Sequence, residues 1–174
     1  MINLSLFSTP VFKGRFETTG RMLSDYNKWI EIEKLLDPDG SKYSTTMNGW
    51  QKPFKPGDKE PQWIGSIMDT LSGIMETLNC NQIKSSWVVE YAAGGYQDLH
   101  MHTNNGSNWS VIFNISGTGK LLLHDPRPHF VSHTSIYVEE IELTAGDWIV
   151  FPSWLVHSSR PSETARSIYV ADIR

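Results

Sequence analysis

The sequence predicts a mainly β protein of the α+β class, in which N-terminal helices support a sheet structure built from the rest of the chain. Helical patterns are confined to residues 18–78, and from residue 85 the chain divides into eight short apolar segments separated by Gly, Pro and Asn. Many short strands punctuated in this way are typical of a β-sandwich or barrel. A length of 174 residues suffices for one domain with a sizeable core. We therefore expect a single domain over 1–174, with a helical buttress and loop in 1–84 and a β core in 85–174.

The composition narrows the class of protein. The chain is 39% hydrophobic and 20% charged, with a formal net charge of -4, and we expect no nucleic-acid partner because non-specific binding requires a basic face. One cysteine, Cys80, excludes an internal disulfide framework and favours a reducing compartment. The N-terminus lacks the pattern of a signal peptide, and no segment approaches the roughly 18 apolar residues of a membrane helix. These features predict a cytoplasmic protein without a membrane partner.

The first part of the chain reads as an extended segment and a helix. Residues 4–16 are apolar at intervals, and Pro10 favours an edge strand or a bend. Residues 18–36 carry apolar side chains at approximately helical spacing. The sequence DPDG at 37–40 has the turn chemistry that ends such a helix.

A loop and a second helix follow. Residues 40–60 show little periodicity and contain two prolines, Pro53 and Pro56, so we expect a loop that either covers a site or connects elements at the surface. Residues 61–78 have a continuous apolar stripe at helical spacing, and Pro61 suits the first turn. Such a stripe predicts a helix packed on the outside of a sheet.

The β core is predicted from period-two patterns between turn residues. We expect strands at 85–93, 97–103, 109–116, 119–124, 136–143, 147–151, 154–158 and 165–173.

A pair of histidines within the second of these strands predicts a metal site. His100 and His102 are two residues apart, so on a strand they share one face together with Asp98. Leu99 and Met101 would then point the other way, into the core. Two imidazoles at this spacing form a bidentate grip on a metal ion, and neutral imidazole is a common ligand of Fe, Zn, Cu and Ni.

The expected third ligand is His157, at the end of the segment GDWIVFPSWLVH that begins at Gly146. Three protein ligands leave open positions for oxygen and a chelating co-substrate, as in the facial triad of non-haem iron oxygenases. The residue patterns leave open whether Asp98 or His102 is the second ligand. His124, His129 and His133 are expected at the surface or beside the substrate.

Arg166 is the expected anchor for an acidic co-substrate. It lies in an apolar run nine residues after His157, and an Arg in a core-like strand is costly unless it is paired. Its planar guanidinium suits a carboxylate. The alternative is a salt bridge to a carboxylate of the protein itself.

Five segments spread over almost the whole chain resemble a known family. They are residues 6–12 (LFSTPVF), 48–51 (NGWQ), 100–114 (HMH followed by SVIFN), 146–157 (GDWIVFPSWLVH) and 166–168 (RSI). They are similar to the motifs LFPTPV, GGWQS, HxH with SGvyY, GxxxxFPSWLxH and RISxSFN of 2-oxoglutarate- and Fe(II)-dependent oxygenases found in bacteria and many phages. That family belongs to the prolyl-hydroxylase-like part of its superfamily.

The resemblance implies a double-stranded β-helix (jelly roll) and a dioxygenase that uses Fe(II) and the co-substrate 2-oxoglutarate. It implies that His100, His102 and His157 hold the iron and that Arg166 holds the distal carboxylate of 2-oxoglutarate, with Asn114 affecting contacts to the co-substrate. The expected reaction is hydroxylation of a C–H bond in a peptide or small molecule, with release of succinate and CO2. A phage-encoded member would act in the host cytoplasm.

Two other functions remain open. A cupin-type metalloenzyme would use the histidines without 2-oxoglutarate and would give Arg166 no special role. A jelly-roll binding module without catalysis would use the abundant aromatic residues and would need no metal. The substrate and the oligomeric state are not indicated by the sequence.

Overall fold

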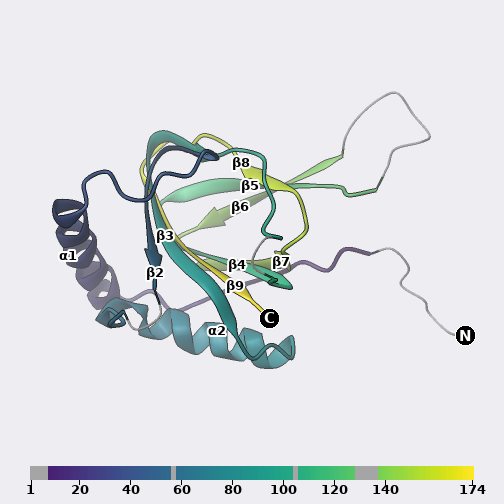
Figure 1. Ribbon diagram of the computed structural model, residues 1–174, viewed down its shortest axis with the longest axis horizontal. Helices are drawn as coiled ribbons and strands as arrows, with labels where there is room; N and C mark the ends of the chain where they lie inside the picture. The colour runs from purple at the N-terminus through teal and green to yellow at the C-terminus, as the bar shows by residue number, and fades with distance from the viewer. Residues whose placement is uncertain (1–7, 56–57, 104–105, 128–136) are drawn as a thin grey trace, which may run out of the picture.

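The computed structural model describes residues 8–55, 58–103, 106–127 and 137–174, and its described part consists of two antiparallel sheets and two α-helices (Figure 1). The larger sheet has the order β1-β7-β4-β9-β3-β2, and the smaller has the order β6-β5-β8. The strands of the larger sheet are β1 (Phe12–Arg15), β7 (Asp147–Pro152), β4 (Trp109–Ser116), β9 (Arg166–Ile173), β3 (Ile83–Gln97) and β2 (Thr46–Phe54). Those of the smaller sheet are β6 (Val138–Thr144), β5 (Thr118–His124) and β8 (His157–Ser159).

The helices cover the outer face of the larger sheet, as predicted. They are α1 (Gly20–Leu36), a short 3-10 turn η1 (Gln62–Ile64) and α2 (Gly65–Thr77), and Figure 1 shows both helices on the side of this sheet away from β5, β6 and β8. The side chain of Thr19 begins α1 by accepting a hydrogen bond from the Met22 amide. The apolar stripe of α2 packs with α1 and the sheet in one cluster that includes Tyr26, Trp63, Ile67 and Tyr169.

A second apolar cluster lies between the two sheets. It contains inward-facing residues of both, among them Val89, Ile112, Leu121 and Ile168. Because side chains alternate along a strand, β9 contributes Tyr169 and Ala171 to the helix-covered face and Ile168 and Val170 to the interior. Two facing sheets around an inner core make the jelly roll that the sequence analysis expects.

Residues 40–60 differ from the expected loop. Residues 46–54 form β2, which pairs with β3 at the edge of the larger sheet. The strand was not recognisable because it contains Gly49 and Pro53, and proline is tolerated in a strand mainly at an edge. Trp50 is buried in the helix-side cluster, and its Nε1 donates to the Asp37 carbonyl at 2.8 Å.

The expected strand at 97–103 is also different. β3 continues through the two glycines to Gln97, and residues 98–103 belong to no strand except for one isolated bridge between His100 and His157. Leu99 and Met101 are 53% and 50% exposed, so the prediction that they enter the core is wrong. The bridge at His100 and the hydrogen bond from the His102 amide to the Ser153 carbonyl hold the two histidines while Leu99 and Met101 stay exposed.

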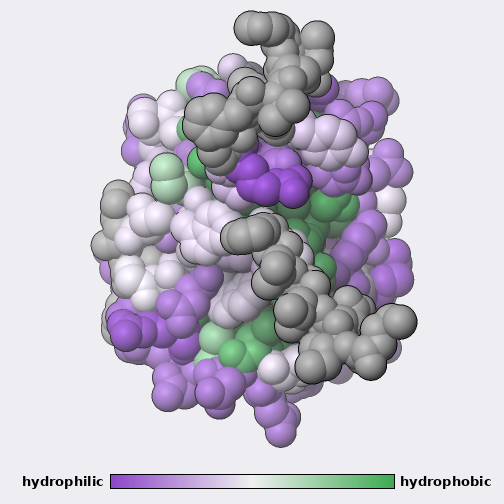
Figure 2. Space-filling model, turned by 90° about the vertical axis from the view of Figure 1, so that its right-hand side faces the viewer, coloured by the Kyte–Doolittle hydropathy of each residue, from purple (hydrophilic) through white to green (hydrophobic). Residues whose placement is uncertain are grey.

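On the face shown in Figure 2, hydrophilic residues surround limited areas of apolar surface. None of the helices in the described part of the chain is both long and apolar enough to span a membrane.

Candidate metal centre

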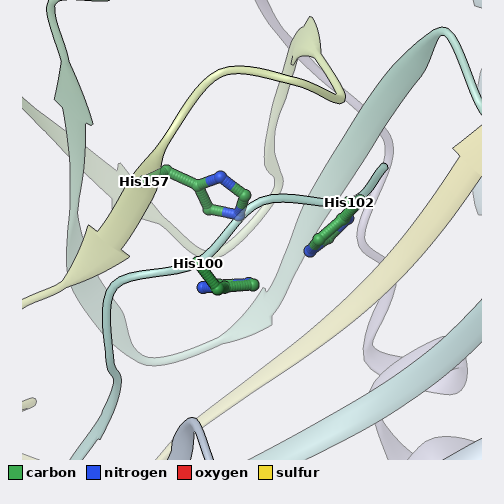
Figure 3. Close-up of side chains that lie close together, drawn as sticks. All are labelled: His100, His102 and His157. Atoms are coloured by element: carbon green, nitrogen blue, oxygen red, sulfur yellow. The ribbon is translucent and has the colours of Figure 1, made fainter. Parts of the chain in front are cut away.

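The structure brings His100, His102 and His157 together. His157 begins β8, and its backbone exchanges two hydrogen bonds with that of His100, at 2.9 and 3.0 Å. The His102 amide donates to the carbonyl of Ser153 at 2.8 Å, which anchors the second histidine to the segment that leads to the third. One potential ligand atom from each imidazole lies within 4.8 Å of the others. Figure 3 shows the three rings turned toward one another.

The hydrogen bonds of the three rings determine which nitrogen is available. Each Nδ1 lies 2.8 Å from an oxygen: the Asp98 carbonyl for His100, the Asp172 carboxylate for His102 and the Leu155 carbonyl for His157. A carbonyl oxygen only accepts, so Nδ1 of His100 and His157 carries the proton. Their Nε2 atoms then present lone pairs, which is the tautomer that a metal ion requires.

The electrostatics of the cluster keep two of the rings neutral. Burial and the nearby His102 lower the pKa of His100 from 6.5 to about 4. Burial, followed by the neighbouring His100 and His102, lowers the pKa of His157 well below its ordinary value. Both imidazoles are therefore unprotonated near pH 7, so a dication does not compete with protons for them.

Asp98 does not join the cluster. Its side chain is exposed and accepts a hydrogen bond from the Leu99 amide at 2.7 Å. Within the described ranges, the only group of three or more potential metal ligands consists of the three histidines. The geometry thus favours His102 over Asp98 as the second ligand.

A buried carboxylate that the sequence analysis missed stands behind His102. Asp172 is 2% exposed, and its Oδ1 lies 2.8 Å from His102 Nδ1. Ser110 also contacts this oxygen at 2.8 Å, and Ser85 donates to Oδ2 at 3.0 Å. One signal was available: Asp172 lies six residues after Arg166 in an apolar strand, and an even spacing places both on the same face.

The histidines and Arg166 line one cavity of about 320 Å³ between the sheets. β9 runs along it, and its inward side chains Arg166, Ile168, Val170 and Asp172 all line the wall. At about 3.3 Å per residue, the Cα atoms of Arg166 and Asp172 are roughly 20 Å apart. Arg166 therefore marks one end of the cavity, and Asp172 with His102 marks the other.

Among the described residues, none compensates the charge of Arg166. The guanidinium lies over the ring of Tyr91, at 4.9 Å from its centroid, and its buried Nε has no hydrogen-bond partner in the described part of the chain. No carboxylate of the described residues forms a salt bridge with it. Burial lowers the pKa of Arg166 and raises that of Tyr91 to about 12. The predicted alternative, a salt bridge within the protein, therefore does not occur among the described residues.

Gly119 on β5 makes room for this guanidinium. A Cβ at this position would lie 1.6 Å from an Arg166 Nη atom, so any larger residue would displace it. Four residues further along β5, Leu123 pairs with His157. At about 3.3 Å per residue, the guanidinium lies roughly 13 Å along the strand from the backbone of His157.

Other expected site residues lie elsewhere. Asn114 is buried but does not line the cavity, and its amide donates to the Gly117 carbonyl at 2.8 Å. Residues 40–60 do contribute to the wall, through residues of β2 such as Gln51 and Pro53, whereas Trp50 faces the opposite side. His124 contacts the Ser158 hydroxyl at 3.3 Å. His129 and His133 lie outside the described residues.

Solved structures resemble this chain along almost its entire length. A prolyl-4-hydroxylase of Pseudomonas putida matches with a TM-score of 0.64 and 15% identity, covering 97% of this chain and 94% of that one. A prolyl hydroxylase from Trichoplax adhaerens, in complex with a hypoxia-inducible factor peptide fragment, matches with a TM-score of 0.69 and 11% identity over 97% and 85% of the two chains. The protein OsALKBH1 matches with a TM-score of 0.59 and 10% identity over 98% and 100%.

No family model and no curated protein matches the sequence. The structural likenesses confirm the jelly-roll fold that the sequence predicted.

Proposed function

We propose that the chain is a 2-oxoglutarate- and Fe(II)-dependent dioxygenase that hydroxylates a C–H bond of a peptide or small molecule. The observation that carries this proposal is that one cavity contains both a potential cation site and a potential anion site. Three histidines at one end present lone pairs to a cation, and the buried Arg166 at the other end has no anionic partner among the described residues. A dicarboxylic acid that chelates a metal through one end satisfies both.

The donor set fits iron. His100, His102 and His157 would hold the ion through Nε2, and imidazole nitrogens suit Fe, Zn, Cu and Ni. Three protein ligands would leave positions available for a chelating co-substrate and for oxygen. The Nδ1 hydrogen bonds fix the rings, so little reorganisation accompanies binding.

The opposite end of the cavity fits the distal carboxylate of 2-oxoglutarate. The fork of Arg166 can bind a carboxylate through two charge-assisted hydrogen bonds, and Gly119 leaves the space in which the fork lies. Between the two ends the wall is apolar, with Leu121, Ile168 and Val170 among its residues. Such a wall suits the methylene groups of the co-substrate and excludes water around it.

Iron with 2-oxoglutarate and oxygen supplies oxidative decarboxylation, which yields succinate and CO2 and provides the oxidising power to hydroxylate a C–H bond. The chain contributes ligand geometry, the cationic anchor and a shielded cavity. A peptide substrate is supported by the Trichoplax neighbour, which is bound to a peptide fragment. Exposed Tyr43 and Met101 line the same cavity and offer apolar surface for such a substrate.

The proposal is tested by loading the protein with Fe(II) without oxygen, adding 2-oxoglutarate and oxygen, and measuring succinate with and without added peptides. Succinate should form only when iron and 2-oxoglutarate are both present, and His157→Ala should produce none. Iron binding without any binding or turnover of 2-oxoglutarate would contradict the proposal and favour a cupin-type metalloenzyme. Absence of stoichiometric metal would instead favour a binding module without catalysis.

A further inference from the structure

The contacts of His102 differ from those of the other two histidines in a way that affects the charge of the centre. His100 and His157 direct Nδ1 at neutral backbone carbonyls, whereas His102 directs Nδ1 at a carboxylate, Asp172 Oδ1, at 2.8 Å. Non-haem iron oxygenases commonly hold iron with two histidines and one carboxylate. Here His102 takes the place of the carboxylate ligand, and the carboxylate of Asp172 lies directly behind its ring.

We propose that Asp172 is a positioning residue of the metal centre, which fixes the His102 ring and supplies the negative charge that a carboxylate ligand would otherwise bring. The inference rests on the metal centre of the proposed function. An ionised carboxylate only accepts hydrogen bonds, so its contact with His102 places the proton on Nδ1 and leaves Nε2 for the metal. A carboxylate partner also raises the basicity of a ligating imidazole.

The structure holds this carboxylate firmly in place. Ser110 Oγ lies 2.8 Å from Oδ1, and Ser85 donates to Oδ2 at 3.0 Å. Ser110 also contacts His102 Nδ1 at 2.9 Å and the hydroxyl of Ser153 at 3.1 Å. These groups lie on β3, β4 and β9 and in the segment after β7, so several elements of the sheet converge on one carboxylate.

Burial gives the carboxylate its electrostatic effect. At 2% exposure, Asp172 is shielded from solvent, and a buried carboxylate is costly unless hydrogen bonds and a nearby positive charge compensate it. The hydroxyls of Ser85 and Ser110 and the His102 Nδ1–H provide hydrogen bonds. A dication on the far side of the His102 ring would provide positive charge, so Asp172 and the metal stabilise each other through one imidazole.

The test compares the affinity for Co(II) among variants by competition with a chromophoric chelator, together with the visible spectrum of the bound ion. Asp172→Asn retains an oxygen that can accept from Nδ1 but loses the charge, and Asp172→Ala loses both. We expect Asp172→Asn to bind Co(II) about 10- to 100-fold more weakly with an altered spectrum, and Asp172→Ala to bind more weakly still. The spectrum reports on the ligand field, which a merely structural role would leave unchanged.

Asp147→Asn is the matched control, because Asp147 is also a buried carboxylate but does not line the cavity. It forms a salt bridge with Arg15, with 2.8 Å between Oδ1 and Nη1. The variant should keep wild-type affinity and spectrum. Ser110→Ala leaves the carboxylate present and removes one of its orienting contacts, so it should weaken Co(II) binding by a smaller factor. If Asp172→Asn does not fold, Ser110→Ala decides alone.

If Asp172→Asn has wild-type affinity and spectrum, the inference is overturned and the metal centre is left intact. The same result in Ser110→Ala overturns the inference if Asp172→Asn does not fold. An equal loss in Asp147→Asn would also overturn it, because the effect would then be one of general destabilisation. Failure of the wild-type protein to bind Co(II) or Fe(II) at all would overturn the metal centre, and the inference with it.

Discussion

The two ends of the central cavity are built from opposite kinds of chemistry. At the histidine end, three imidazoles are fixed by oxygen acceptors behind them and direct lone pairs inward. At the arginine end, a guanidinium is buried over Tyr91, and its Nε has no hydrogen-bond partner within the described ranges. One end is prepared for a cation and the other for an anion.

This difference favours a ligand with two chemically different ends. A metal ion alone would satisfy the first end, and a simple anion alone would satisfy the second. β9 lines the cavity from Arg166 to Asp172 with apolar residues between, so a molecule with a metal-binding group and a distal acid would complement both ends.

The largest effect is expected from His157→Ala, which removes one of the three proposed ligands and should abolish stoichiometric iron binding. The fold should persist, as checked by circular dichroism, because the aromatic contacts of this ring are with Phe151 and the other two histidines. Metal content of protein loaded with Fe(II) without oxygen is the measurement.

Asp98→Ala is the control for this experiment, since Asp98 is exposed and outside the cluster. It should retain full iron. Loss of iron in Asp98→Ala with retention in His102→Ala would assign the second ligand to the carboxylate instead.

At the other end of the cavity, Arg166→Ala should weaken binding of 2-oxoglutarate and leave iron binding intact. Loss of a charge-assisted contact costs about 1.5–3 kcal/mol, roughly ten- to a hundredfold in affinity. Arg166→Lys keeps the charge without the fork and should fall between the wild type and Arg166→Ala. Calorimetric titration of metal-loaded protein without oxygen measures these affinities.

Arg160→Ala provides the matched control, because Arg160 is exposed and pairs with Glu140 at 3.1 Å. Its affinity for 2-oxoglutarate should equal that of the wild type. If Arg160→Ala and Arg166→Ala weaken binding equally, the arginine end has no specific role.

Gly119→Ala tests the arginine end without removing its charge. The added methyl group would lie 1.6 Å from Arg166 Nη1 and must displace the guanidinium. We expect a loss of about 1 kcal/mol in 2-oxoglutarate binding, roughly fivefold, with unchanged metal content. Gly73→Ala is the control because a Cβ there meets no atom within 4 Å, and it should leave both affinities unchanged.

The histidine end should also have a small pH signature that the arginine end lacks. The folded protein without metal keeps His100 neutral down to about pH 4, and the pKa of His157 is also lowered. The unfolded chain takes up these protons near pH 6.5, so the free energy of unfolding should decrease as pH falls from 6.5 toward 4. Melting temperatures in the presence of a chelator should show this decrease, and His100→Asn should reduce it. Identical pH dependence in both proteins would contradict the assignment.

The sequence predicted the bounds of the central strands well. The strand expected at 109–116 is β4 with the same bounds, and β9 begins one residue later than expected. Both are central strands, so their apolar pattern is strong. β2 was missed because an edge strand tolerates Pro53 and Gly49, which read as loop residues.

The candidate site was predictable only in part, because its geometry depends on strand pairing. The spacing of His100 and His102 indicated a shared direction, and the single bridge to His157 provides it without a regular strand. The even spacing of Arg166 and Asp172 indicated a shared face, but the contacts of Asp172 with His102 and of Gly119 with Arg166 join residues far apart in the sequence, which no local pattern encodes. Leu99 and Met101 are exposed because residues 98–103 form one bridge and no regular strand.

We infer that one ligand bridges the two ends, and exchanging this ligand for a keto acid without the distal carboxylate provides the test. Affinities of 2-oxoglutarate and of 2-oxobutyrate, which has the keto acid group without the distal carboxylate, are measured for metal-loaded wild type and Arg166→Ala. We predict that the wild type prefers 2-oxoglutarate by about ten- to a hundredfold and that this preference disappears in Arg166→Ala. An equal preference in both proteins, or none in the wild type, would contradict the claim.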